Sequence, residues 1–132
     1  MDRRTAISMV GLGLAATGTS VAETTPSSGG IKLVMLYGHP PDPAEFDKYY
    51  LGVHMPLVAA IKGFRRMEAA KCLPQADGSP PAFYRTFEMW FDSPEHMAAV
   101  LATPEGMKVR ADVANFTTGT TVTRLVCKLD RW

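Results

Sequence analysis

The sequence has few cysteines and an almost even charge. Only two cysteines occur in 132 residues, and lysine and arginine outnumber aspartate and glutamate by 14 to 13. The spacing of Cys72 and Cys127 matches no zinc-binding or haem-attachment motif. Without a basic stripe or an acidic tail, the even charge argues against binding to nucleic acid or to a membrane surface.

Motifs for cofactors and metals are also missing. No glycine-rich phosphate loop and no dinucleotide fingerprint is present, so nothing supports a bound nicotinamide or flavin. The three histidines, His39, His54 and His96, show neither His-x-His nor His-x-x-x-His spacing. We therefore predict no cofactor and no metal. His39, in a Gly-His-Pro-Pro turn, and His96, in the first turn of a helix, are expected to be solvated.

Residues 1–22 have the pattern of a secretory signal peptide. A pair of arginines precedes a short, weakly apolar, glycine-rich run, and Ser-Val-Ala follows with small residues at both positions that a signal peptidase reads. The run is too short for a transmembrane helix, and the doubled arginine favours the twin-arginine route. We expect a periplasmic or secreted protein with a flexible linker at 23–30, one folded domain at 31–130 and no membrane attachment after cleavage. The alternatives are a disordered N-terminal extension and a start placed upstream of an intracellular domain.

The remaining sequence predicts six elements in the order β-α-β-β-α-β. Strand-like runs occupy 31–38, 63–72, 82–91 and 119–129. The first helix starts at Asp42-Pro43-Ala44-Glu45, which supplies an N-cap, a proline at the first helical position and an acid three residues after the cap. Ser93-Pro94-Glu95 repeats this start. Because Pro56 disfavours helical geometry at Met55, we expect the first helix to break or kink near His54.

This order predicts an α+β fold, a ferredoxin-like split βαβ sandwich with two helices on one face of a four-stranded antiparallel sheet. The third strand, however, is apolar on both faces: Phe83, Phe87, Met89 and Phe91 point one way, and Tyr84 and Trp90 the other. Two helices can cover only one face. We therefore expect a second subunit to cover the other, in a face-to-face homodimer.

Several motifs resemble the EthD family of dimeric α/β-barrel proteins. They are Tyr37-Gly38, the aromatic helix ending in His54-Met55-Pro56-Leu57, the strand end Trp90-Phe91, the Ser93-Pro94-Glu95 helix start, and Thr103-Pro104-Glu105-Gly106. The resemblance covers roughly residues 31–129. It implies a sheet that pairs with that of a second subunit to form a barrel, with a pocket in each protomer. In the strand order that this fold implies, the second and fourth strands are opposite edges, so we expect no intrachain bond between Cys72 and Cys127.

His54 is the main candidate for an acid/base residue. It shares a helical face with Phe46 and Tyr50, and this face should point toward the first strand, where Tyr37 lies near the end. An imidazole that titrates near neutrality can accept or donate a proton on a carbonyl-containing aromatic substrate. We assign His54 and Tyr37 as catalytic candidates, and Tyr50, Phe46 and Trp90 as substrate-binding candidates. The alternative is a histidine that only bonds the last carbonyls of its helix.

Two functions follow from this reading. The first is an exported homodimeric enzyme, an oxidoreductase or a proton-transfer enzyme, that acts on a small aromatic or polyketide-like carbonyl compound. EthD proteins are often labelled oxidoreductases, and relatives of this barrel include cyclases, isomerases, oxygenases and haem-handling enzymes, so the fold alone does not choose among them. The second is a non-catalytic periplasmic binding protein for a hydrophobic metabolite or haem. Replacing His54 separates them, because an enzyme would keep its ligand affinity and lose turnover.

Overall fold

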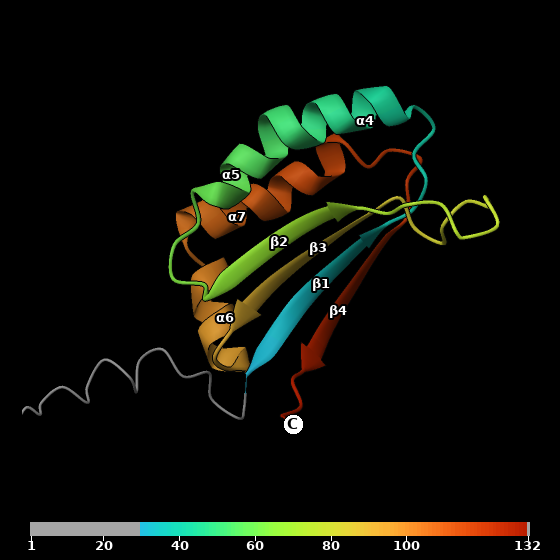
Figure 1. The fold of residues 1–132 in the computed structure, drawn as a ribbon. Coiled ribbons are helices and arrows are strands. Elements are labelled where there is room, and N and C mark those ends of the chain that lie inside the picture. The colour runs from blue at the N-terminus through green and yellow to red at the C-terminus, as the bar shows by residue number, and fades with distance from the viewer. Residues whose placement is uncertain (1–29, 132) are drawn as a thin grey trace, which may run out of the picture.

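A computed structural model describes residues 30–131 (Figure 1). The strands are β1 (Ile31–Tyr37), β2 (Arg66–Lys71), β3 (Arg85–Phe91) and β4 (Val122–Lys128). The helical segments are α4 (Pro43–Tyr49), the π-helix η2 (Tyr50–His54), α5 (Met55–Ala59), α6 (Pro94–Leu101), α7 (Pro104–Asp112) and the 3-10 turn η3 (Val113–Asn115). The predicted signal peptide lies outside the described residues, so export stays a prediction. No helix within residues 30–131 is long and apolar enough to cross a membrane.

The four strands form one antiparallel sheet in the order β2-β3-β1-β4. The two central strands pair along their whole length, from Ile31 opposite Phe91 to Tyr37 opposite Arg85. The helices lie over one face of this sheet (Figure 1). The predicted ferredoxin-like α+β fold is therefore confirmed. Cys72 directly follows β2 and Cys127 lies in β4, which places the two thiols at opposite edges of the sheet, as expected.

Three helices begin where the sequence supplies a cap followed by proline. The side chains of Asp42, Ser93 and Thr103 accept the backbone N–H three residues later, at 3.1, 3.0 and 3.2 Å. Each satisfies one of the N–H groups that the first turn of a helix leaves without a partner. The helix starts predicted from sequence at Asp42 and Ser93, and the restart of the second helix predicted at Thr103, are confirmed.

At His54 the first helix changes its pitch instead of ending. In η2 the N–H of Met55 bonds the carbonyl of Tyr50, five residues back, and Met55 keeps helical dihedrals with φ −63° and ψ −35°. In a regular α-helix the ring of Pro56 would clash with the carbonyl four residues earlier. The wider π turn accommodates the proline while the helical path continues into α5. Turns of this kind occur frequently at functional sites.

The core lies between the sheet and the helices. Its largest fully buried side chains are Tyr37, Tyr50, Met89 and Val58. The predicted alternation of side chains is wrong at Tyr84. β3 begins only at Arg85, so Tyr84 precedes the strand and its side chain does not follow the alternation of the strand. Its ring packs edge-on against Phe46, and its hydroxyl donates to Asp47 of α4 at 2.8 Å. The same carboxylate accepts from Arg85 at 2.8 Å, which fastens α4 to the sheet.

Gly106, in the first turn of α7, is a position where the fold has no room for a side chain. A Cβ there would lie 2.5 Å from the carbonyl oxygen of Leu101, so the backbone would have to move. We expect Gly106→Ala to lower the free energy of unfolding by about 1–3 kcal/mol, as overpacking does.

The matched control is Gly52 in η2, where a Cβ would meet nothing within 4 Å. Gly52→Ala is expected to raise the free energy of unfolding by about 0.5–1 kcal/mol, because alanine loses less backbone entropy than glycine. Chemical denaturation of both variants measures the difference. Equal effects of the two substitutions would contradict the close contact at Gly106.

Candidate active site

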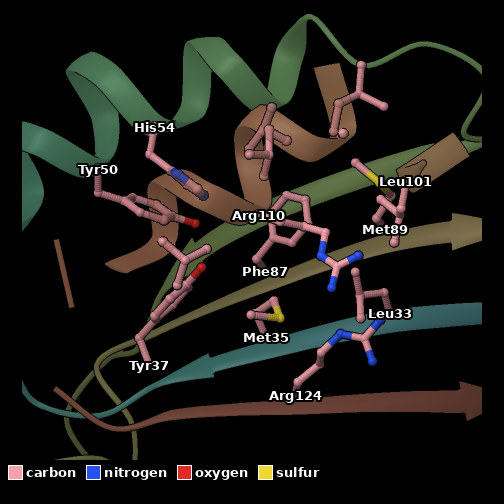
Figure 2. A pocket seen from close by; sticks show the side chains of 15 residues that line it. Leu33, Met35, Tyr37, Tyr50, His54, Phe87, Met89, Leu101, Arg110 and Arg124 are labelled. Carbon is pink, nitrogen blue, oxygen red and sulfur yellow. The ribbon is translucent and has the colours of Figure 1, made fainter. Parts of the chain in front are cut away.

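A cavity of about 450 Å³ lies between the sheet and the helices (Figure 2). Most of its wall is apolar, with Leu33 and Met35 from β1 and Phe87 and Met89 from β3. Five polar side chains reach the wall: Tyr37, Tyr50, His54, Arg110 and Arg124. A mostly apolar cavity of this size with a few convergent polar groups is typical of a small-molecule site. Among the described residues, no three His, Cys, Asp or Glu side chains lie close enough together to hold a metal ion.

His54 and Asp112 form a buried pair beside this cavity. The Nδ1 atom of His54 lies 2.9 Å from one carboxylate oxygen of Asp112. The other oxygen accepts the Tyr49 hydroxyl at 2.6 Å and the Asn115 amide at 3.0 Å. Burial alone would raise the pKa of Asp112, but the hydrogen bonds from Tyr49, Asn115 and His54 outweigh it and hold that pKa below its ordinary value. Asp112 is therefore ionised at neutral pH.

The ionised carboxylate determines which nitrogen of His54 carries the hydrogen. A carboxylate can only accept, so Nδ1 of His54 donates and Nε2 keeps its lone pair. Burial lowers the pKa of His54, and it outweighs the hydrogen bond and the negative charge of Asp112, which raise it. The ring is neutral at neutral pH. Within residues 30–131 no group hydrogen-bonds Nε2, and the ring lines the cavity, so His54 offers a free base to a bound molecule.

Tyr37 and Tyr50 stand beside His54. The Tyr50 ring stacks on the imidazole with centroids 5.8 Å apart and meets the Tyr37 ring edge-on at 5.5 Å. Burial raises the pKa of Tyr50 to about 12 despite the nearby Arg85, and burial together with Tyr50 raises the pKa of Tyr37 further, so both phenols keep their hydrogens. Figure 2 shows both hydroxyl groups directed toward the cavity.

The hydroxyl of Tyr50 is buried and has no hydrogen-bond partner among the described residues. An unsatisfied buried hydroxyl costs about 1–3 kcal/mol, and such groups in folded proteins call for an explanation. A bound molecule with an acceptor oxygen would satisfy it. Tyr50 is therefore the most direct indication that the cavity is built for a polar group at this end.

The remaining two candidates from the sequence do not line the cavity. Phe46 is buried behind Tyr50, stacked on its ring at 5.7 Å, and supports the wall without forming it. Trp90 lies on the opposite face of the sheet, beneath the cations of Lys32 and Arg66 at 5.6 and 4.6 Å from its ring. The pleat of β3 puts Trp90 there, because Met89 on one side and Phe91 on the other point to the helices.

The two histidines outside the cavity form hydrogen bonds with backbone groups. His96 was expected to be solvated, but its Nδ1 accepts the N–H of Asp92 at 2.9 Å and its Nε2 bonds the carbonyl of Gly63 at 2.7 Å. It thus joins the start of α6 to the loop before β2. His39 is exposed and bonds the carbonyl of Pro81 at 2.7 Å.

Comparisons with known proteins place this chain within a family. A family model described as the EthD domain matches residues 39–120. A curated 11.0 kDa protein of Rhodococcus erythropolis, from the thcB-thcC intergenic region, is 41% identical over 88 residues, which are 67% of this chain and 84% of that protein. This chain belongs to the EthD family. The crystal structure of an EthD family protein from Bacillus halodurans is similar to it, with 30% identity, a TM-score of 0.67, and 74% of this chain and 95% of the other covered.

More distant proteins share the fold alone. The cofactor-independent oxygenase SnoaB from Streptomyces nogalater is 15% identical with a TM-score of 0.53, over 79% of this chain and 96% of its own. A dimeric protein with a ferredoxin-like fold from Bacteroides fragilis is 14% identical with a TM-score of 0.54, over 76% of this chain and 97% of its own. A similar fold is thus found in at least one enzyme that works without a cofactor.

Asp112, Phe116, Arg110 and Arg124 are site residues that the sequence analysis missed. The Phe116 ring lies 4.5 Å from the imidazole of His54 and completes its apolar surroundings. A signal for Asp112 was present, because it falls on the same helical face as Val109, Val113 and Phe116. A carboxylate on an apolar helical face needs a hydrogen-bonding partner in the core. The sequence offered no means of choosing His54 as that partner.

The pKa of His54 tests this geometry. In an NMR pH titration we expect the pKa of His54 below 6.5, the ordinary value of a histidine, because burial disfavours the charged ring. Asp112→Asn should lower it further, since the carboxylate that stabilises the imidazolium is removed. The control is Asp130→Asn, which makes the same change at an exposed carboxylate and should leave the pKa of His54 unchanged. A pKa above 6.5, or one that ignores the Asp112 substitution, would contradict the buried pair.

Proposed function

We propose that this EthD-family chain is a proton-transfer enzyme for a small carbonyl compound with an apolar body, with His54 as the general base. The observation that carries the proposal is the buried His54–Asp112 pair, which leaves the unprotonated Nε2 of a neutral imidazole at the wall of an apolar cavity. A catalytic base needs a free lone pair, a position within reach of the substrate and a pKa near the working pH. The geometry supports the first two requirements, and the lowered pKa of His54 keeps its ring in the unprotonated form at neutral pH.

In this proposal Nε2 of His54 removes a proton from the carbon next to the carbonyl. The electron pair of the C–H bond moves toward the carbonyl oxygen, which becomes an enolate oxygen. Tyr50, whose hydroxyl has no partner among the described residues, donates its hydrogen bond to that oxygen, and Tyr37 lies beside it. Hydrogen-bond donors that are already in place where negative charge develops stabilise the transition state strongly in an apolar cavity.

Asp112 acts through His54. It keeps the hydrogen on Nδ1 and stabilises the imidazolium that forms when Nε2 takes up the proton. The imidazolium then returns the proton to the same or to another carbon, which gives isomerisation or exchange.

Hydrogen–deuterium exchange on carbon tests the proposal without knowledge of the natural substrate. β-Tetralone and indanone are apolar ketones with exchangeable C–H groups, and their deuteration in D₂O is followed by proton NMR. We expect the wild-type chain to accelerate exchange and His54→Gln to slow it by roughly 10²- to 10⁴-fold, the usual contribution of a general base. Because only the neutral ring is a base, the rate should rise with pH through the pKa of His54 and then level off.

His39→Gln is the matched control, because it makes the same change at an exposed histidine outside the cavity. It should leave the exchange rate unchanged. A His54→Gln variant that keeps the wild-type rate, with its fold intact by circular dichroism, would refute the role of His54.

We also propose that a second copy of the chain covers the free face of the sheet. No helix among the described residues lies over that face, which carries the apolar side chains Val34, Leu36, Trp90 and Leu125. Its charges are neutralised within the face, where Lys32 pairs with Glu88 at 2.9 Å. The dimeric state of the similar fold from Bacteroides fragilis supports a homodimer here.

Adjacent residues of β4 allow a matched test of the dimer. Leu125 lies on the free face and is 43% exposed, whereas Val126 faces the helices and is 46% exposed. We expect Leu125→Glu to give the mass of a monomer in light scattering, because a charge would be buried in the interface. Val126→Glu should leave the mass of a dimer. A monomeric wild-type chain, or the same mass for both variants, would contradict the proposed interface.

A further inference from the structure

Two arginines reach the cavity from different elements. Arg110 comes from α7 and Arg124 from β4, and both line the same cavity as His54 (Figure 2). We infer that the cavity selects an organic anion, so that the carbonyl compound it binds also carries a carboxylate or a similar acidic group. This inference rests on the proposed function in one respect only, that the anion and the reacting carbonyl belong to one molecule.

The charged side chains that line the cavity are both cationic, and the ionised Asp112 lies behind His54. No aspartate or glutamate is among the residues that line it. Elsewhere in the described chain arginines have carboxylate partners, as Arg85 has Asp47 and Arg65 has Asp92. Within residues 30–131, no side chain makes a hydrogen bond or an ion pair with Arg110 or Arg124. Both side chains are exposed, so water satisfies them when no ligand is bound, and their guanidinium groups at the wall of an apolar cavity stay accessible to a ligand that carries negative charge.

The position of Arg124 also singles it out. The register places it opposite Met35, on the face of β4 that looks toward the helices, between Val122 and Val126. Arg124 is exposed, so its aliphatic stem lies along this row while its guanidinium group stays accessible to a ligand. A guanidinium presents a planar fork of donors that matches a carboxylate with two parallel hydrogen bonds.

The arrangement also orients the ligand. In Figure 2 the phenols of Tyr37 and Tyr50 and the imidazole of His54 lie toward one end of the cavity, and the two guanidinium groups toward the other. The apolar side chains of Met35 and Phe87 lie between these ends. An anionic group held by the arginines would thus place the carbonyl of the same molecule beside His54, with an apolar body between the two.

A pair of fluorescent probes tests the charge preference directly. Anilinonaphthalene sulfonate (ANS) and N-phenylnaphthylamine (NPN) share their aromatic body and differ by one sulfonate. We expect the full chain to bind ANS more tightly than NPN, with a shift of the His54 imidazole resonances when ANS is added. Arg110→Gln and Arg124→Gln should each weaken ANS binding by roughly 5- to 20-fold, as expected for a charged hydrogen bond, and change NPN binding by less than about twofold.

Lys108→Gln is the matched control, because Lys108 is an exposed cation on α7 that does not line the cavity, and the substitution makes the same change in charge. It should change neither affinity. If the wild-type chain shows no preference for ANS, if both arginine variants bind ANS as wild type does, or if they lose ANS and NPN equally, the inference is overturned.

The same experiment separates this inference from the proposed function. His54→Gln should keep the preference for ANS, because the anion contacts lie elsewhere in the cavity. An arginine-dependent preference together with no catalysed exchange would support the anion site and reject proton transfer. Catalysed exchange that depends on His54, with no preference for the anionic probe, would support proton transfer and reject the anion site. Carboxylate and phosphate forms of a naphthalene ligand, as competitors of ANS, then identify the acidic group.

Discussion

The hydrogen bond between His54 and Asp112 connects the packing of this protein to its chemistry. It joins η2 to the end of α7 across 58 residues of sequence and sets the tautomer of the imidazole at the cavity wall. Burying two ionisable groups costs several kcal/mol unless their hydrogen bonds are satisfied. Tyr49 and Asn115 complete those of Asp112. A carboxylate in the last turn of a helix also faces the negative end of the helix dipole, so the hydrogen bonds from Tyr49, Asn115 and His54 must offset that repulsion.

The surrounding fold positions this pair. The π turn places Tyr50 and His54 with their rings stacked, and β1 supplies Tyr37 opposite them. The sheet forms the floor of the cavity and α7 part of its cover. The base and the phenols then occupy one part of the wall and the guanidinium groups another. A ligand that satisfies both parts has one orientation, which is what a proton transfer at a defined carbon requires.

The sequence predicted the order of the elements because their starts have local chemical signals. The caps at Asp42 and Ser93 and the β-branched run at 31–37 depend only on neighbouring residues. The exact strand bounds were harder to predict. β3 begins three residues after the start of the predicted strand 82–91, so Tyr84 precedes the strand and lies on the other face from the one predicted. The π turn was also beyond local reasoning, because Met55-Pro56 predicts only a departure from α geometry.

Part of the site was accessible from sequence and part was not. His54, Tyr37 and Tyr50 were predicted from an aromatic helical face next to the end of a strand, and the structure brings them together. Asp112 lies on an element 58 residues away from His54, and Arg124 on a strand further still, so no local pattern links them to the histidine. Trp90 was assigned to the site although its own strand alternation placed it on the other face. Pairings between distant elements depend on the register of the sheet, which only the structure provides.

The most direct measurement is a ¹⁵N NMR spectrum of the His54 ring at a pH above its pKa. The shifts of the two ring nitrogens show which of them carries the hydrogen. Our account predicts a protonated Nδ1, hydrogen-bonded to Asp112, and an unprotonated Nε2 facing the cavity. A hydrogen on Nε2, or on both nitrogens, would leave no base at the cavity wall and would contradict the account.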